Sequence, residues 1–142
     1  MECTVRWTGA GSEGMTFQAE TGSGHILNMD GAPEGGGRNL APRPMEVVLA
    51  GTGGCTAYDV VVILRKSGQA VSGCDVRVDA ERADTDPKVF TRIRMHFIVR
   101  GKALKKNLVD HAVRLSHEKY CSASAMLGKT AEITMDAEIV ED

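Results

Sequence analysis

Apolar and polar residues alternate in six stretches of the chain, which is the period that half-buried β-strands require. Glycine-rich turns separate the first three stretches, and this pattern predicts a three-stranded meander at the N-terminus. The fourth and fifth stretches flank a turn at 84–87 and predict a hairpin of long strands. The predicted strands span 2–8, 15–19, 26–29, 71–82, 89–100 and 131–139.

From 102 to 119 the apolar residues change to the period of an amphipathic α-helix. One further turn is expected over 125–129, and Ser122 is the candidate for its N-cap. The element order βββ-α-ββ-α-β predicts a single α+β domain over residues 1–142, with a mostly antiparallel sheet. The stretch 30–44 is rich in glycine and proline, and we expect a loop that binds something or crosses to a partner.

Residues 45–66 are the predicted central element, a helix of about 20 residues and roughly 30 Å. The helix is apolar on nearly every side, which predicts that it is buried. Gly51, Gly53 and Gly54 stand near its middle and indicate that another backbone or a ligand approaches closely. One sheet face and one amphipathic helix do not cover such an element, so we expect its burial in a two-fold homodimer interface.

The composition argues against several classes of function. A formal net charge of −2 gives no general attraction to nucleic acid or to an anionic membrane. No secretory leader is visible, and Glu46, Thr52 and Asp59 interrupt the only run that approaches a membrane span. Four cysteines without an export signal indicate reduced thiols in the cytoplasm, and neither their spacing nor the scattered histidines predict a zinc site.

The four cysteines fall into two groups. Cys3 and Cys74 lie on the predicted inward faces of strands, where cysteine behaves as a small hydrophobic residue. Cys55 and Cys121 belong to helix-associated segments and have small neighbours. Two such thiols that meet in the fold could reduce a peroxide, because one would become a sulfenic acid and the other would condense with it to a disulfide.

Segments 44–49, 53–61 and 118–122 resemble the two cysteine signatures of the OsmC/Ohr family, the osmotically inducible and organic hydroperoxide resistance proteins. The YhfA-like branch is the most similar, and segments 90–93 and 96–99 also have counterparts there. The separation of 66 positions between the two cysteines agrees with the family, and the resemblance covers almost the whole chain.

This resemblance implies an OsmC-like fold in which the sheets of two intertwined subunits wrap two central helices. It implies a thiol-dependent peroxidase for organic hydroperoxides, with Cys55 as the peroxidatic thiol and Cys121 as the resolving thiol. It also implies recycling by an external dithiol such as a lipoyl group, without a metal, haem or flavin cofactor.

The family's peroxidases place a Glu directly after the proline that precedes the helix, where it orients an Arg. Here Met45 occupies that place and Glu46 follows it, rotated by about 100° around a helix. Glu46 is therefore a candidate supporting residue, or else a carboxylate stabilised by the N-terminal end of the helix. Arg38 and Arg43 are the candidates for the cation that favours the Cys55 thiolate, and each could instead be a solvated loop charge.

Two other functions fit the same residues. Met45 in place of the family's Glu favours a protein that binds an apolar small molecule in an interface pocket without efficient catalysis. A thiol redox sensor that traps a partner on Cys121 is the other alternative. The residues expected to line the apolar pocket are Met45, Leu49, Met126 and Leu127.

Overall fold

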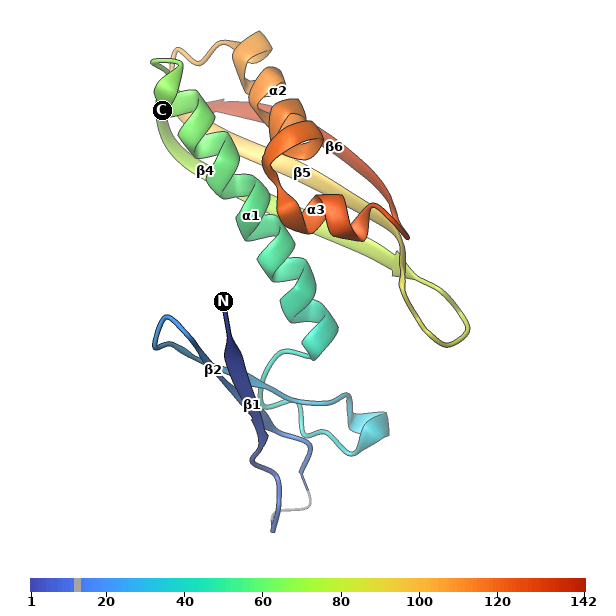
Figure 1. Cartoon of the computed structure of the whole chain (residues 1–142). Helices are drawn as coiled ribbons and strands as arrows, with labels where there is room; N and C mark the ends of the chain where they lie inside the picture. The colour runs from blue at the N-terminus through green and yellow to red at the C-terminus, as the bar shows by residue number, and fades with distance from the viewer. Residues whose placement is uncertain (12–13) are drawn as a thin grey trace. The chain divides into compact units, whose positions relative to one another are not determined.

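The computed structural model describes residues 1–11 and 14–142. The chain forms two compact units, Met1–Val48 and Leu49–Asp142, and the division falls inside helix α1 (Pro44–Lys66). Each unit contains a three-stranded sheet (Figure 1). The α+β class expected from the sequence is thereby confirmed.

The first unit contains the predicted meander. Strands β1 (Cys3–Trp7), β2 (Phe17–Thr21) and β3 (Ile26–Met29) pair in that order, and both pairings are antiparallel. A short turn over 22–25 that contains two glycines connects β2 to β3, so the alternation and the turn residues together predict this hairpin.

The expected inward position of Cys3 is wrong for the single chain. Strand β1 is exposed along its whole length, and Trp7 retains 53% of its surface exposure. The only other elements among the unit's described residues are the 3₁₀ turn η1 (Pro33–Gly35) and the start of α1, so no full helix of this unit covers the sheet. Alternation shows which face of a strand is apolar, but it does not show that the same chain covers that face.

The loop that follows β3 is organised by Asp30, a buried carboxylate. Its oxygens accept the backbone N–H groups of Leu40, Arg38 and Gly31 at 3.1, 3.0 and 2.7 Å. These hydrogen bonds, led by the bond from Leu40, hold the pKa of Asp30 below its usual value. Gly37 passes so close to Gly31 that an added Cβ would lie 1.8 Å from the Gly31 carbonyl oxygen. The glycine-rich segment is therefore an ordered loop with a steric requirement for glycine.

The second unit contains a sheet in the order β4-β5-β6, made by β4 (Ala70–Arg82), β5 (Phe90–Lys102) and β6 (Glu132–Glu141). Strands β4 and β5 form the predicted antiparallel hairpin, whereas β6 runs parallel to β5. Three of the four strand pairings in the described chain are antiparallel, as expected. The parallel pairing requires a long crossover, and the helical segments between β5 and β6 supply it.

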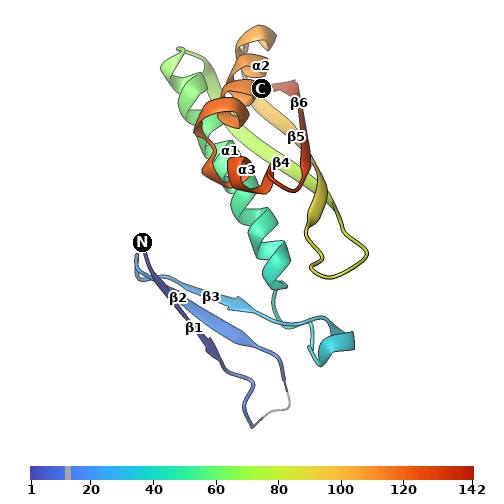
Figure 2. The same ribbon diagram turned by 45° about the vertical axis from the view of Figure 1, so that its right-hand side comes forward.

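The crossover consists of three consecutive helical pieces. These are α2 (Lys106–Leu115), the π-helical turn η2 (Ser116–Tyr120) and α3 (Ser122–Leu127). The sequence predicted one helix over 102–119, and the structure divides that range into α2 and η2 and starts the helix later. Within this unit the helices lie on one face of the sheet, as two views show (Figures 1 and 2). The core between these layers contains Val60, Leu64, Ile93, Met95, Phe97, Val99, Val109 and Ala112.

Within the single chain, helix α1 is buried on one side, and burial of its other sides was expected only across a homodimer interface. Thr52, Thr56, Val60 and Leu64 recur every fourth residue and form the buried stripe, whereas Tyr58 on another side is 72% exposed. The other apolar residues of the helix are half-buried or exposed, and Val48 and Tyr58 are its exposed large ones.

The glycines of α1 also differ between its buried side and its other sides. A Cβ added to Gly53 would lie 3.1 Å from Val78 Cγ2, whereas no atom lies within 4 Å of a Cβ added to Gly51 or Gly54. Among the described residues, the close approach expected at all three glycines therefore occurs only at Gly53.

Helix α1 is the one helix among the described residues that is long and apolar enough to cross a membrane by length and composition. We expected no such segment, because polar residues interrupt the run. Its stripe of residues packed against β5 is typical of a core helix, and the hydroxyl of Thr56 contacts Met95 Sδ at 3.9 Å.

Candidate functional site

The second unit brings Cys55 and Cys121 together. Cys55 lies in the middle of α1, and Cys121 directly follows η2. Their sulfur atoms and a carboxylate oxygen of Asp59 all lie within 4.8 Å of one another. Cys55 is half-buried, and Cys121 retains only 2% of its surface exposure. Two thiols that the sequence places 66 positions apart thus share one partly enclosed site.

Local helix geometry places each of these side chains. Cys55 and Asp59 are one turn apart on α1, so they lie on the same face of the helix. On the opposite segment, the backbone N–H of Cys121 donates to the Ser116 carbonyl at 2.8 Å, the wider hydrogen bond of a π turn. The Ser116 hydroxyl also donates to Asp59 Oδ2 at 3.0 Å. The π turn therefore positions Cys121 and at the same time connects to α1.

Cys121 is the N-cap of α3, a role that we expected for Ser122. The backbone N–H of Ser124 donates to Cys121 Sγ at 3.3 Å, and Ser122 is already the first residue of the helix. Burial raises the pKa of the Cys121 thiol, and the hydrogen bonds with Ser124 partly oppose this shift. A buried thiol with a raised pKa suits a resolving cysteine better than an attacking one, because the thiolate is the nucleophile.

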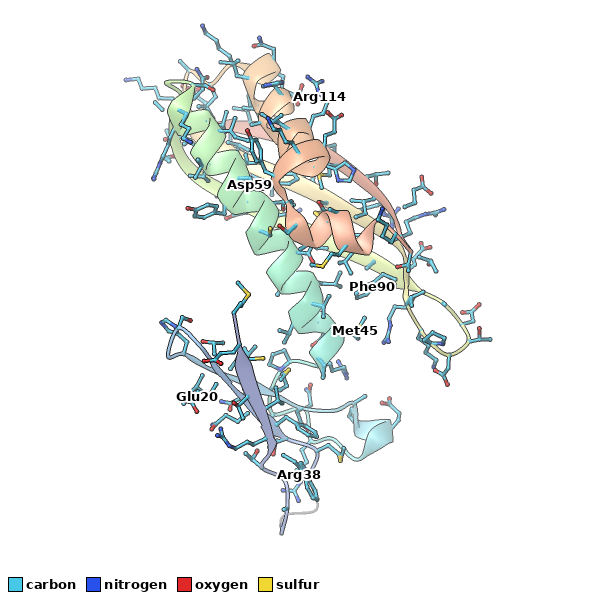
Figure 3. The ribbon with its side chains drawn as sticks, in the orientation of Figure 1. Glu20, Arg38, Met45, Asp59, Phe90 and Arg114 are labelled. Atoms are coloured by element: carbon cyan, nitrogen blue, oxygen red, sulfur yellow. The ribbon has the colours of Figure 1, made fainter. Side chains whose placement is uncertain are left out.

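Sequence reasoning missed Asp59 and Ser116. Asp59 projects from the middle of α1 (Figure 3) and forms no ion pair with any residue among 1–11 and 14–142. The available signal was a carboxylate one turn after a cysteine, inside an otherwise apolar run. Such a position is unfavourable for a solvated charge and therefore indicates a local partner.

The sequence model of the OsmC-like protein family matches residues 35–136, a span that includes both cysteines of the site. This chain belongs to the OsmC-like family. Protein YhfA of Escherichia coli strain K12 is 46% identical to it over 140 residues, which cover 99% of this chain and 98% of YhfA.

Solved structures of the family share the fold. A hypothetical protein from Aquifex aeolicus VF5 superposes with a TM-score of 0.85 at 24% identity, over 99% of this chain and 96% of that one. An organic hydroperoxide resistance protein OsmC from Legionella pneumophila superposes with a TM-score of 0.67 at 18% identity, over 97% of each chain. At these identities the two structures establish the fold, and the OsmC-like architecture is confirmed.

The second unit of this OsmC-like chain contains a cavity of about 410 Å³. Asp59 lines the cavity and also touches the thiol site. Val62, Ile63 and Leu115 supply apolar walls, and the polar residues Lys66, His111 and Tyr120 also line it. The cavity offers space for a small organic molecule, and Asp59 connects it to the thiol site, whereas neither cysteine lines it.

The supporting residues expected from the family lie in the first unit. The Arg43 backbone N–H donates to Glu46 Oε2 at 2.9 Å, and its guanidinium donates to Oε1 at 3.1 Å. These bonds hold the pKa of Glu46 below its usual value and place its carboxylate at the start of α1. The Arg38 backbone N–H binds Asp30 in the ordered loop. A role for Glu46, Arg38 or Arg43 at the thiols stays a prediction.

Proposed function

We propose that this protein is a cytoplasmic, thiol-dependent peroxidase that reduces organic hydroperoxides in defence against oxidative stress. One observation carries the proposal, namely that the Cys55 and Cys121 sulfur atoms lie within 4.8 Å of each other. Membership of the OsmC-like family and the partly apolar cavity that shares Asp59 with the thiol site support it.

In the proposed cycle, the Cys55 thiolate attacks the terminal oxygen of the hydroperoxide. The O–O bond breaks, the alkoxide takes up a proton to become an alcohol, and Cys55 becomes a sulfenic acid. The Cys121 sulfur then attacks the Cys55 sulfur, and the sulfenic oxygen leaves as water while the disulfide forms. An external dithiol, such as a lipoyl group, reduces the disulfide and is itself oxidised to a disulfide.

The supporting residues have proposed roles in the first step. A thiolate at neutral pH needs a nearby cation, and Arg43 or Arg38 would supply it. Glu46 would orient Arg43, which it already binds through two hydrogen bonds.

We also propose that the protein acts as a homodimer. Both units leave large apolar side chains exposed in the single chain, and a partner subunit would cover them. The exposed apolar residues include Val5, Trp7, Ile26, Leu27, Tyr58 and Met126.

Peroxide consumption by the purified, reduced protein tests the enzyme. With dihydrolipoamide present, the wild type and the Cys74→Ser control should consume tert-butyl hydroperoxide over many turnovers, and Cys55→Ser should not. Mass spectrometry after one equivalent of hydroperoxide should show an internal disulfide between Cys55 and Cys121. A folded protein with no consumption and an unchanged mass would refute the enzyme and favour a binding protein for an apolar small molecule.

A further inference from the structure

We propose that the reduced protein binds one zinc ion per chain through Cys55, Asp59 and Cys121. The zinc site shares Cys55 and Cys121 with the proposed peroxidase, but it can be tested independently, because metal binding requires neither a hydroperoxide nor turnover. The sequence did not predict it, since the cysteines follow no recognised metal-binding spacing and the carboxylate was not singled out.

The geometry of the three side chains fits a small metal ion. One sulfur from each cysteine and one oxygen from Asp59 lie within 4.8 Å of one another. Ligands on a tetrahedral zinc ion are about 3.5 to 3.8 Å apart, because Zn–S bonds are about 2.3 Å and Zn–O bonds about 2.0 to 2.2 Å. The three side chains would rotate toward the ion to reach those separations. The fourth position would be left to water, as in other open zinc sites.

The surroundings orient the proposed ligands. Cys55 and Asp59 lie one turn apart on a rigid helix, a spacing at which two helix residues can share one ion. The Ser116 hydroxyl donates to Asp59 Oδ2 at 3.0 Å, which leaves Oδ1 for the metal. The Ser124 backbone N–H donates to Cys121 Sγ at 3.3 Å and supports a charged sulfur. Such outer contacts fix ligand orientation in metal sites.

Charge gives a second argument. With both thiols deprotonated, the cluster would carry three negative charges. Lys66 lines the adjoining cavity, but within the described part of the chain no cation forms an ion pair with Asp59. A divalent cation at the centre would neutralise most of this charge and would deprotonate the thiols that bind it.

The ligand types select zinc. Magnesium and calcium prefer sites made entirely of oxygen, and copper(I) prefers sulfur ligands and would not require the carboxylate. Two thiolates, one carboxylate and one open position form a mixed set that suits Zn²⁺.

Competition with a chromophoric chelator, together with native mass spectrometry, tests the site on the reduced full-length protein. The wild type should bind one Zn²⁺ per chain. Cys55→Ser and Cys121→Ser should each weaken binding by more than about 100-fold, beyond the loss typical of an outer contact, and Asp59→Asn by at least about tenfold. Cys74→Ser and Asp75→Asn are matched controls, because they alter an adjacent thiol and carboxylate elsewhere in the unit and should leave the affinity unchanged.

Two further measurements do not depend on a cysteine variant that folds. Co²⁺ in place of Zn²⁺ should give sulfur-to-cobalt charge-transfer absorption in the wild type. Oxidation with diamide should abolish Zn²⁺ binding, and a dithiol should restore it, because the Cys55–Cys121 disulfide removes both thiolates. Absence of stoichiometric binding, binding that survives either cysteine substitution or oxidation, or loss of binding in the Cys74 and Asp75 controls would each overturn the proposal.

Discussion

At the scale of single residues, Asp59 has the largest consequence for the chemistry of the site. Its carboxylate lies within 4.8 Å of both sulfur atoms and accepts the Ser116 hydroxyl, so it connects α1 to the turn that positions Cys121. The proposed peroxidatic thiolate at Cys55 needs a nearby cation, as a thiolate at neutral pH generally does. The proposed Arg43 or Arg38 would supply that charge during catalysis, and the proposed zinc ion would supply it when bound.

Replacing Cys121 should separate the two reaction steps, because attack on the hydroperoxide needs only Cys55 and disulfide formation needs both cysteines. Cys121→Ser keeps the attacking thiol and removes the one that condenses with the sulfenic acid. One equivalent of hydroperoxide should then be consumed, and a dimedone adduct should appear on Cys55 by mass spectrometry. Sustained turnover with dihydrolipoamide should fall by at least about 100-fold, the lower range for loss of a positioned catalytic group.

Cys74→Ser is the matched control for that experiment, because Cys74 is a half-buried thiol on β4 outside the cluster. It should keep full turnover and show a dimedone adduct only in trace amounts. Wild-type turnover in Cys121→Ser would instead mean that the external dithiol reduces Cys55 directly, and Cys121 would lose its assigned role.

The sequence predicted some of these residues and not others for a definite reason. The small-residue settings of Cys55 and Cys121, together with the family signatures, singled out both thiols. Asp59 and Ser116 are 57 positions apart, and no local pattern indicates that their side chains meet. The expected inward position of Cys3 was wrong, because alternation shows which face of a strand is apolar but not whether another layer covers that face.

At the scale of elements, the crossover between β5 and β6 builds the site. A regular helix from 102 to 119 would end without the wider turn that η2 makes. In the structure that turn carries both Ser116, which binds Asp59, and the carbonyl that holds Cys121. Hydrophobic periodicity predicted the helix but not its π turn, because one additional residue in a turn hardly changes the apolar pattern.

On the face of the second sheet away from the helices, charged side chains of neighbouring strands form ion pairs. Arg94 of β5 binds Asp79 of β4 at 2.6 Å, and His96 Nδ1 of β5 lies 3.0 Å from Asp136 Oδ2 of β6. Glu138 also lies 3.6 Å from His96 Nε2. These contacts, the hydrogen bond to Asp136 first among them, raise the pKa of His96 above its usual value.

This shift predicts a pH-dependent contribution to stability. Since the pKa of His96 is higher in the folded state, its contact with Asp136 stabilises the fold fully below the unfolded pKa of about 6.5. The contribution disappears as the pH rises through the folded pKa. Asp136→Asn should therefore lower the free energy of unfolding clearly at about pH 5.5 and only slightly at about pH 9, as measured by urea denaturation.

Asp79→Asn provides the comparison for this measurement. Its partner Arg94 keeps its charge throughout the range, so its loss should be similar at both pH values. Arg77 is paired with His96 in the β4–β5 register and also stays charged, so it does not add a second transition. An Asp136→Asn effect of equal size at both pH values would show that the contact does not depend on the charge of His96.

At the scale of the whole molecule, both units have apolar surface that a single chain leaves exposed. Strand β1 is exposed and carries Trp7, and α1 carries Tyr58 away from its buried stripe. The sequence predicted that α1 would be covered on nearly all sides, and the single chain covers one. The hydrophobic pattern therefore predicted which surfaces are apolar and need burial. It could not show which of these surfaces a single chain buries.

A homodimer would bury the apolar surface that the single chain leaves exposed. A substitution that disrupts the dimer tests this directly. Sedimentation equilibrium of the wild type at micromolar concentration should give twice the mass of one chain. Tyr58→Asp should shift the equilibrium toward the monomer by at least about tenfold in the dissociation constant, because an unpaired charge in an interface is costly and each 1.4 kcal/mol corresponds to a factor of ten. Val140→Asp makes the same kind of change at an exposed position of β6 on the charged face and should leave the dimer intact. A wild type that sediments as a monomer would refute the dimer, and an unchanged dissociation constant in Tyr58→Asp would show that Tyr58 is not at its interface.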